Sequence, residues 1–238
     1  MEIDASQHAI ANVLYDIFFK ELKGNNAKKL ADLNLEIKKA YDKAGVPGDM
    51  RIQWFDVKTF CDTSAPHQNY PELMTSVVKA RKTRYLVPAA YELARKFCKN
   101  DTYSSRRFYC LKNLHEAYQI VDEHPLFLPD AAYVKYKACV ENFLSHYVAL
   151  AQYSVRCTDR IGQFQWSFVP KFHFMNHIVD DALYLSPKAF WCYSGETMVG
   201  IVTRIAQSCL AGLPPWKVSQ TLCIKYGVAK ALQFEESS

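Results

Sequence analysis

Apolar residues recur at steps of three and four positions along most of the chain, which is the spacing that places side chains on one face of an α-helix. The first two helices are joined by Gly24 and Asn25, and we expect them to form an antiparallel hairpin. Helices are predicted over 6–23, 26–44, 71–97 with a kink or restart at Pro88, 104–123, 129–151, 170–185, 195–211 and 215–232.

Two short segments alternate with a period of two instead, which is typical of a β-strand. They lie near 51–60 and 163–169. The chain has only 8 glycines and 10 prolines, so long elements with few tight turns are expected. The predicted fold is therefore mainly α, a multi-helix globular bundle with one or two short strands. We divide it into an N-terminal helical hairpin, 1–48, and a main helical domain, 49–238.

Composition supports a globular protein, because 50% of the residues are hydrophobic and 22% are charged. The sequence contains no apolar run of membrane-spanning length and no secretory signal pattern, so we expect no membrane partner. An intracellular location follows, with the nucleus as a candidate compartment. The eight cysteines form no CxxC pair, which favours free, mostly buried thiols.

Positive charge concentrates in one segment, 79–112, which holds ten basic residues against Glu92 and Asp101. Aromatic residues are interleaved with the bases, as in surfaces that pair with phosphates and stack on bases. The alternative is a pair of solvated helix faces whose aromatic side chains point inward. The candidate nucleic-acid-binding residues are Lys79, Arg81, Lys82, Arg84, Arg95, Lys96, Lys99, Arg106 and Arg107.

A possible metal site lies on the helix predicted from Pro170. His173, His177 and Asp181 are spaced four residues apart, so their side chains project from nearly one face. Two imidazoles and a carboxylate in that arrangement can hold a divalent metal ion. The alternative is that the histidines bond to carbonyl groups or to a nearby acid. Cys192 with His177 is a further candidate pair, for which buried packing is the competing interpretation.

Glu196 follows Ser194 and Gly195 at a predicted helix start. A carboxylate there interacts favourably with the helix dipole, which is the plain structural explanation. The functional alternative is an acid that projects towards the histidine helix.

The segment from Pro170 to Asp181, followed by Ser186, Pro187 and Glu196, resembles the late part of RNase H-like cut-and-paste transposases of the CACTA and Plavaka kind. Similar reading frames derived from mobile elements occur in protist genomes. The resemblance implies that Glu196 is the last catalytic acid and that His173 and His177 flank the site. Asp56, on the first predicted strand, is placed like the first acid. No second acid is evident, and the upstream part of such an enzyme is missing.

Three functions follow from these observations. We favour a non-enzymatic, transposase-derived helical domain that binds nucleic acid through the basic face at 79–112 and needs no cofactor. The alternative is a metal-dependent phosphodiester-cleaving enzyme, or a remnant of one, which uses Mg²⁺ or Mn²⁺ with the histidines, Asp181, Glu196 and Asp56. The third is a helical protein-interaction module, for which the 6–44 hairpin is the natural partner surface.

Overall fold

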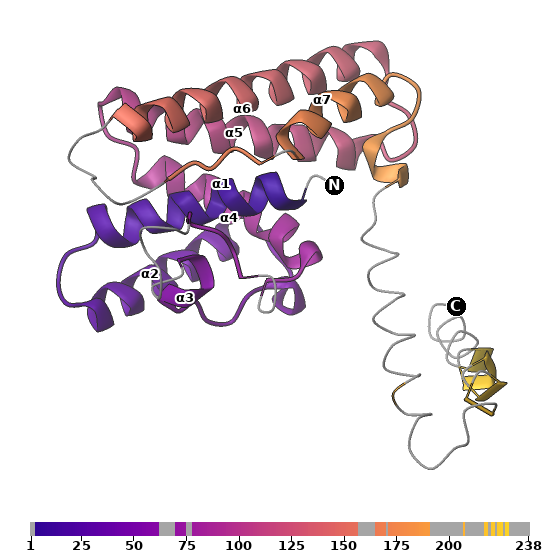
Figure 1. Ribbon diagram of the computed structural model, residues 1–238, viewed down its shortest axis with the longest axis horizontal. Coiled ribbons are helices and arrows are strands. Elements are labelled where there is room, and N and C mark those ends of the chain that lie inside the picture. Colours follow the sequence, from indigo (N-terminus) through magenta and orange to yellow (C-terminus); the bar gives the residue numbers. More distant parts are fainter. Residues whose placement is uncertain are drawn as a thin grey trace. The chain divides into compact units, whose positions relative to one another are not determined.

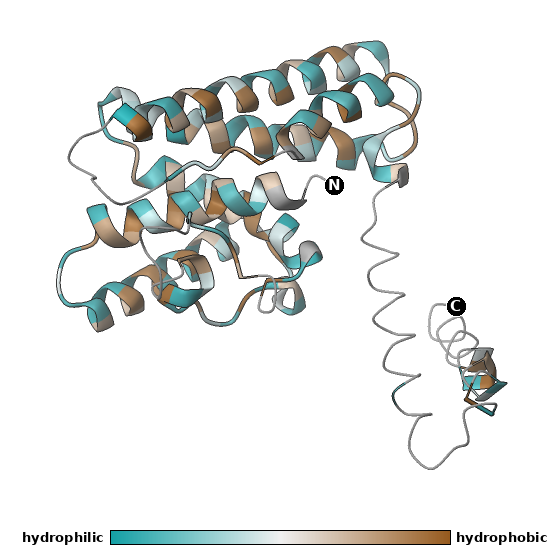
Figure 2. Ribbon diagram, viewed as in Figure 1, coloured by the Kyte–Doolittle hydropathy of each residue, from teal (hydrophilic) through white to brown (hydrophobic). Residues whose placement is uncertain are grey.

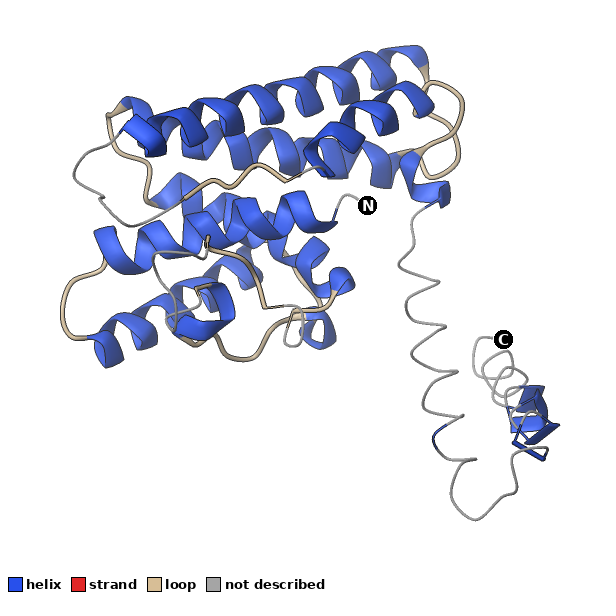
Figure 3. Ribbon diagram, in the orientation of Figure 1, coloured by secondary structure: helices blue, strands red, loops and turns tan. Residues whose placement is uncertain are grey.

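The structure is a computed structural model, which describes residues 3–61, 70–74, 78–156, 165–169 and 171–190, together with 207, 217–218, 220–221, 223–225 and 227–228. These residues form helices and connecting loops, and no strand occurs among them (Figures 1 and 3). The mainly α prediction is thereby confirmed. In chain order the elements are α1 (Ile3–Asp16), the π-helical turn η1 (Ile17–Glu21), α2 (Asn26–Lys43), the 3-10 turn η2 (Gly48–Met50), α3 (Val57–Phe60), α4 (Ala80–Lys96), α5 (Thr102–Glu123), α6 (Asp130–Arg156), α7 (Lys171–Asp181) and the 3-10 turn η4 (Pro187–Phe190).

Contacts divide the chain into two units, Met1–Phe190 and Trp191–Ser238. We placed the domain boundary after residue 48, but α1 and α2, which precede that point, both pack on α4, which follows it. The N-terminal helix pair therefore lies within the first unit. The helices predicted over 195–211 and 215–232 fall almost wholly outside the described residues.

Helix α1 is the centre of the first unit. All its side chains from Ala5 to Asp16 are buried, including the polar side chains of Ser6, Gln7, His8, Asn12 and Asp16. It contacts α3, α4, α5 and α7, so it has no face left for water. The helix predicted over 6–23 is present, but the exposed polar face that its apolar spacing indicates is buried.

Helices α5 and α6 pack against each other along their length (Figure 1). The buried residues of α6 recur at the three- and four-residue steps that predicted the helix, and the same stripe is visible as alternating hydrophobic and hydrophilic positions in Figure 2. Tyr147 on this stripe packs its ring against Phe172 of α7, with centroids 4.2 Å apart. This aromatic contact joins α7 to the α5–α6 pair.

The strand predicted near 51–60 is wrong. Residues 51–56 are a loop between η2 and α3, and residues 57–60 form α3. The hydrogen bonds of Phe55 come from a side chain instead of a neighbouring strand. The Asn34 amide accepts from the Phe55 N–H at 2.7 Å and donates to the Phe55 carbonyl at 2.8 Å. The side chain of Asp56 then caps α3 by accepting from the Thr59 N–H at 2.8 Å.

The second predicted strand, near 163–169, is also absent from its described part, 165–169. The backbone of Trp166 has a φ of 59°, in the left-handed region that bulky residues rarely adopt. This turn places Gln165 and Trp166 both in the interior, which breaks the alternation of buried and exposed positions. Tyr147 holds the segment by donating its hydroxyl to the Ser167 carbonyl at 2.8 Å.

The helix predicted from Pro71 begins later. Residues 71–74 are not helical, and α4 starts at Ala80 and continues through Pro88 without a break. Proline inside a helix removes one hydrogen bond, and here it is tolerated within a helix whose flanking residues Val87 and Ala89 are fully buried. No helix in the described ranges is both long and apolar enough to cross a membrane.

Three histidines make the stability of the fold dependent on pH. Burial lowers the pKa of His8, His115 and His146; for His8 it outweighs the opposing effects of Glu72 and of the backbone at Pro71. The unfolded chain therefore binds more protons below about pH 6.5, so stability rises with pH through that range. We expect the free energy of unfolding, measured with urea, to fall between about pH 7.5 and 5.5. His8→Gln should reduce this fall, because it removes one of the three buried imidazoles.

Candidate functional site

The predicted basic face is largely neutralised by acids from other parts of the chain. Lys96 pairs with Glu36 of α2, Lys99 with Glu21 of η1, and Arg84 with Asp122 at the end of α5. Arg95 pairs with Glu92 within α4, and Lys112 pairs with Glu116 within α5. The charge that the segment shows in sequence is therefore much smaller at the surface.

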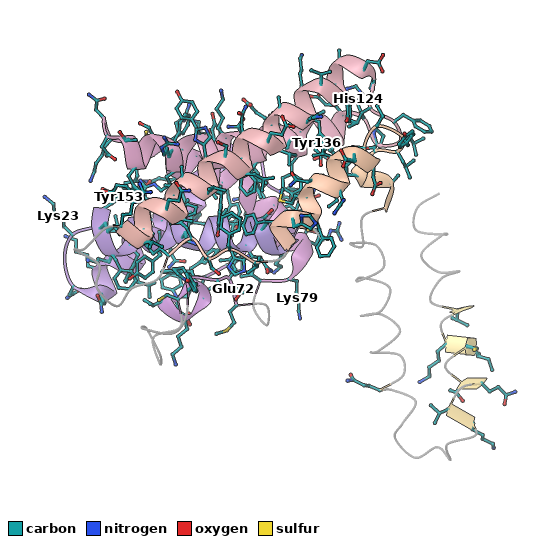
Figure 4. All side chains as sticks on the ribbon, turned by 45° about the horizontal axis from the view of Figure 1, so that its top comes forward. Lys23, Glu72, Lys79, His124, Tyr136 and Tyr153 are labelled. Atoms are coloured by element: carbon teal, nitrogen blue, oxygen red, sulfur yellow. The ribbon has the colours of Figure 1, made fainter. Side chains whose placement is uncertain are left out.

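Arg107 is a special case, because its side chain is only 1% exposed and cannot reach a phosphate outside the protein. Lys79, Arg81, Lys82 and Arg106 form no ion pair among the described residues. Arg106 lies one turn along α5 from Tyr103, whose ring packs at a tilt against Tyr153, and Lys79 precedes α4 well apart from Tyr153 (Figure 4).

The predicted metal residues are only partly brought together. His173 and His177 are both exposed, and their Nε2 atoms lie 3.1 Å apart on one turn of α7. Asp181 is exposed at the end of that helix. In the described part of the chain, no group of three His, Cys, Asp or Glu side chains is arranged to hold a metal ion.

Among the described residues, the remaining catalytic candidates form no site. Asp56 uses its carboxylate to cap α3 and is not on a strand. Glu196 and Cys192 lie outside the described residues. Burial raises the pKa of the Cys110 thiol, and raises that of Cys139 to about 11, so neither is prepared to act as a thiolate nucleophile.

A buried polar cluster around Asp16 was missed by sequence reasoning. The fully buried Asp16 carboxylate accepts hydrogen bonds from the Tyr103 hydroxyl at 2.7 Å and the Gln165 amide at 3.0 Å. Lys20 also donates to it, and Arg107 Nη1 lies 3.4 Å from it. This Asp16 cluster joins η1, α5 and the segment at 165–166. Its charges are compensated internally, so its role is to hold these elements together.

A surface at one end of the helices was also missed. Leu126 and Phe127 lie in the α5–α6 loop and are 62% and 66% exposed, while Tyr184, in the turn after α7, is 76% exposed. The two turns adjoin, because Ser186 donates its N–H to the Leu126 carbonyl at 2.8 Å. His124 marks this end in Figure 4. We call the set the end patch; it consists of Leu126, Phe127, Leu183, Tyr184 and Leu185.

Acidic residues flank both turns of the end patch along the chain. Asp130 begins α6 just after the first turn, and Asp180 and Asp181 end α7 just before the second. All three are exposed and form no ion pair among the described residues. The nearby Lys188 is already paired with Asp122 at 3.0 Å. The exposed apolar side chains are therefore bordered by unpaired negative charge.

These features leave the end patch as the part of the described surface best suited to a partner. Large apolar side chains that stay exposed on two adjoining turns are a feature of interaction sites, whereas single exposed ones are ordinary. The chain matches no family model, no curated protein and no solved structure.

Proposed function

We propose that this protein is a non-enzymatic helical interaction domain whose end patch binds a basic amphipathic segment of another protein. The observation that carries the proposal is the pairing of exposed apolar side chains, Phe127 and Tyr184 above all, with the unpaired carboxylates of Asp130, Asp180 and Asp181. Aromatic side chains at the centre of an interface supply most of its binding energy. The acidic border favours a basic partner and repels the phosphates of nucleic acid.

The partner surface differs from the one we expected. The 6–44 hairpin cannot supply it as a whole, because α1 is buried on all sides. The nucleic-acid hypothesis remains a prediction. It is supported by fewer residues than the sequence suggested, because six of the ten bases in 79–112 have acidic partners.

We expect the full chain to bind a synthetic amphipathic helix whose leucines are spaced three and four residues apart, with lysine at the other positions. An analogue with glutamate in place of lysine should bind much more weakly, because it meets the carboxylates of the end patch. Replacing both Phe127 and Tyr184 by Ser should weaken binding by about thirtyfold, the equivalent of about 2 kcal/mol. Fluorescence anisotropy of labelled peptides measures each case.

Trp54→Ser is the matched control, since Trp54 is another exposed aromatic residue, 56% exposed, outside the end patch. Its binding should equal that of the wild type. Equal binding of the lysine and glutamate peptides, or no effect of the double substitution, would refute the proposal. Salt-sensitive binding of double-stranded DNA that is lost in Arg81→Glu with Lys82→Glu would favour the nucleic-acid hypothesis instead.

A further inference from the structure

His173 and His177 hold two imidazole nitrogens at the separation of a metal chelate. Their Nε2 atoms are 3.1 Å apart. Zn²⁺ binds histidine nitrogen at about 2.0–2.1 Å, so a single ion bound to both atoms would have a nitrogen–metal–nitrogen angle of about 100°. This value falls between the cis angles of octahedral and tetrahedral coordination, so the helix backbone does not have to move.

The surroundings of the pair leave room for an ion. Both side chains are exposed, and their rings stand at 87° to each other, so rotation about the side-chain bonds can turn both lone pairs to one point. At present one ring donates a hydrogen bond to the other. When both Nε2 atoms bind an ion, the proton on Nε2 of the donating ring moves to Nδ1 of the same ring, so each imidazole stays neutral and keeps one N–H.

We infer that His173 and His177 form a two-imidazole binding site for a divalent transition-metal ion such as Zn²⁺ or Ni²⁺, with water completing the coordination. Imidazole suits these ions, whereas Mg²⁺ and Mn²⁺ prefer oxygen ligands. The site thus differs from the three-residue set predicted from the sequence, and it does not depend on the end patch.

One member of the pair, His173, also lines a hollow in the surface. His173 and Asn176 line one side of this hollow, whose volume is about 520 Å³. Phe168, Phe172 and residues of α6 line the rest. Metal ions with three or fewer protein ligands keep positions for water or an exchangeable ligand.

Isothermal titration calorimetry of the full chain with NiCl₂ or ZnCl₂ tests the inference. One ion should bind, and His173→Gln or His177→Gln should each weaken binding by about tenfold or more, because the second ligand of a chelate acts intramolecularly. MgCl₂ should give no heat. Paramagnetic broadening by Ni²⁺ should appear first on the ring protons of His173 and His177.

His124→Gln is the control, because it removes a histidine that lies outside the pair. Its affinity should match that of the wild type. Unchanged affinity in both pair variants, or broadening centred on other residues, would overturn the inference. Circular dichroism of each variant shows whether it is folded, which separates loss of the site from loss of the helix.

Discussion

Replacing Arg107 by Met is expected to lower the free energy of unfolding by about 3–5 kcal/mol, the cost of removing one partner from a buried ion pair. Arg107 and Asp16 are 1% and 0% exposed, so neither charge can be compensated by water. The substitution also removes the 2.8 Å hydrogen bond that Arg107 donates to the Phe97 carbonyl. Urea unfolding followed by circular dichroism measures the change.

Arg106→Met is the matched control, because Arg106 is the preceding residue of α5, is half-buried and forms no ion pair among the described residues. Its effect should stay within about 0.5 kcal/mol. Adding Asp16→Asn to Arg107→Met should cost less than the sum of the two single changes, since the second removes a charge that has already lost a partner. Equal effects at 106 and 107 would show that the Asp16 cluster does not stabilise the fold.

The regular parts of the fold could be predicted because their evidence is local. Helix α6 follows from a three- and four-residue apolar pattern without Gly or Pro. Helix α2 begins directly after the predicted junction at Gly24 and Asn25, where the Asn25 side chain caps it by accepting from the Lys28 N–H at 2.9 Å. The two strand predictions failed because the alternating pattern shows neither distant hydrogen-bond partners nor an unusual backbone angle. Asn34 supplies the hydrogen bonds of Phe55, and an unusual backbone angle reverses the pattern at Trp166.

The charged residues show most clearly what a count along the sequence does not predict. A count along 79–112 finds a strong positive excess, but the acids that neutralise it come from distant positions such as Glu21, Glu36 and Asp122. In the same way, the polar side of α1 looked solvent-facing, although Asn12 and Asp16 meet partners more than 85 residues away. A polar side chain needs a hydrogen-bond partner, and the sequence does not say whether that partner is water.

The sequence gives one indication of the end patch, because Leu126, Phe127 and Leu128 form a run of three apolar residues in a loop bounded by prolines. The sequence does not show that the turn after α7 lies beside this loop. The hydrogen bond between Ser186 and Leu126 joins segments 60 residues apart, and only the fold brings Asp130 and Asp181 to the same border. Interaction surfaces made from two turns are therefore recognised from structure more readily than from sequence.

Replacing Trp166 by Ala should also lower the free energy of unfolding by about 3–5 kcal/mol, because the change opens a cavity in the core. The ring is 1% exposed and packs edge-on against Tyr147 with centroids 5.2 Å apart. Its indole N–H donates to the Tyr103 hydroxyl at 2.9 Å, so the substitution also weakens the Asp16 cluster. Trp54→Ala, at an exposed position, should cost about 0.5 kcal/mol or less.

The backbone at Trp166 allows a sharper comparison. Gly is ordinarily less stabilising than Ala, but a φ of 59° is left-handed, where a side chain with a Cβ costs about 1–2 kcal/mol. Trp166→Gly should therefore be as stable as Trp166→Ala or more stable by about 1 kcal/mol, although both lose the same ring. Urea unfolding of the two variants measures the difference. If the glycine variant is clearly the less stable of the two, the left-handed turn does not persist once the ring is gone, and the tryptophan side chain itself is what holds the 165–169 segment in place.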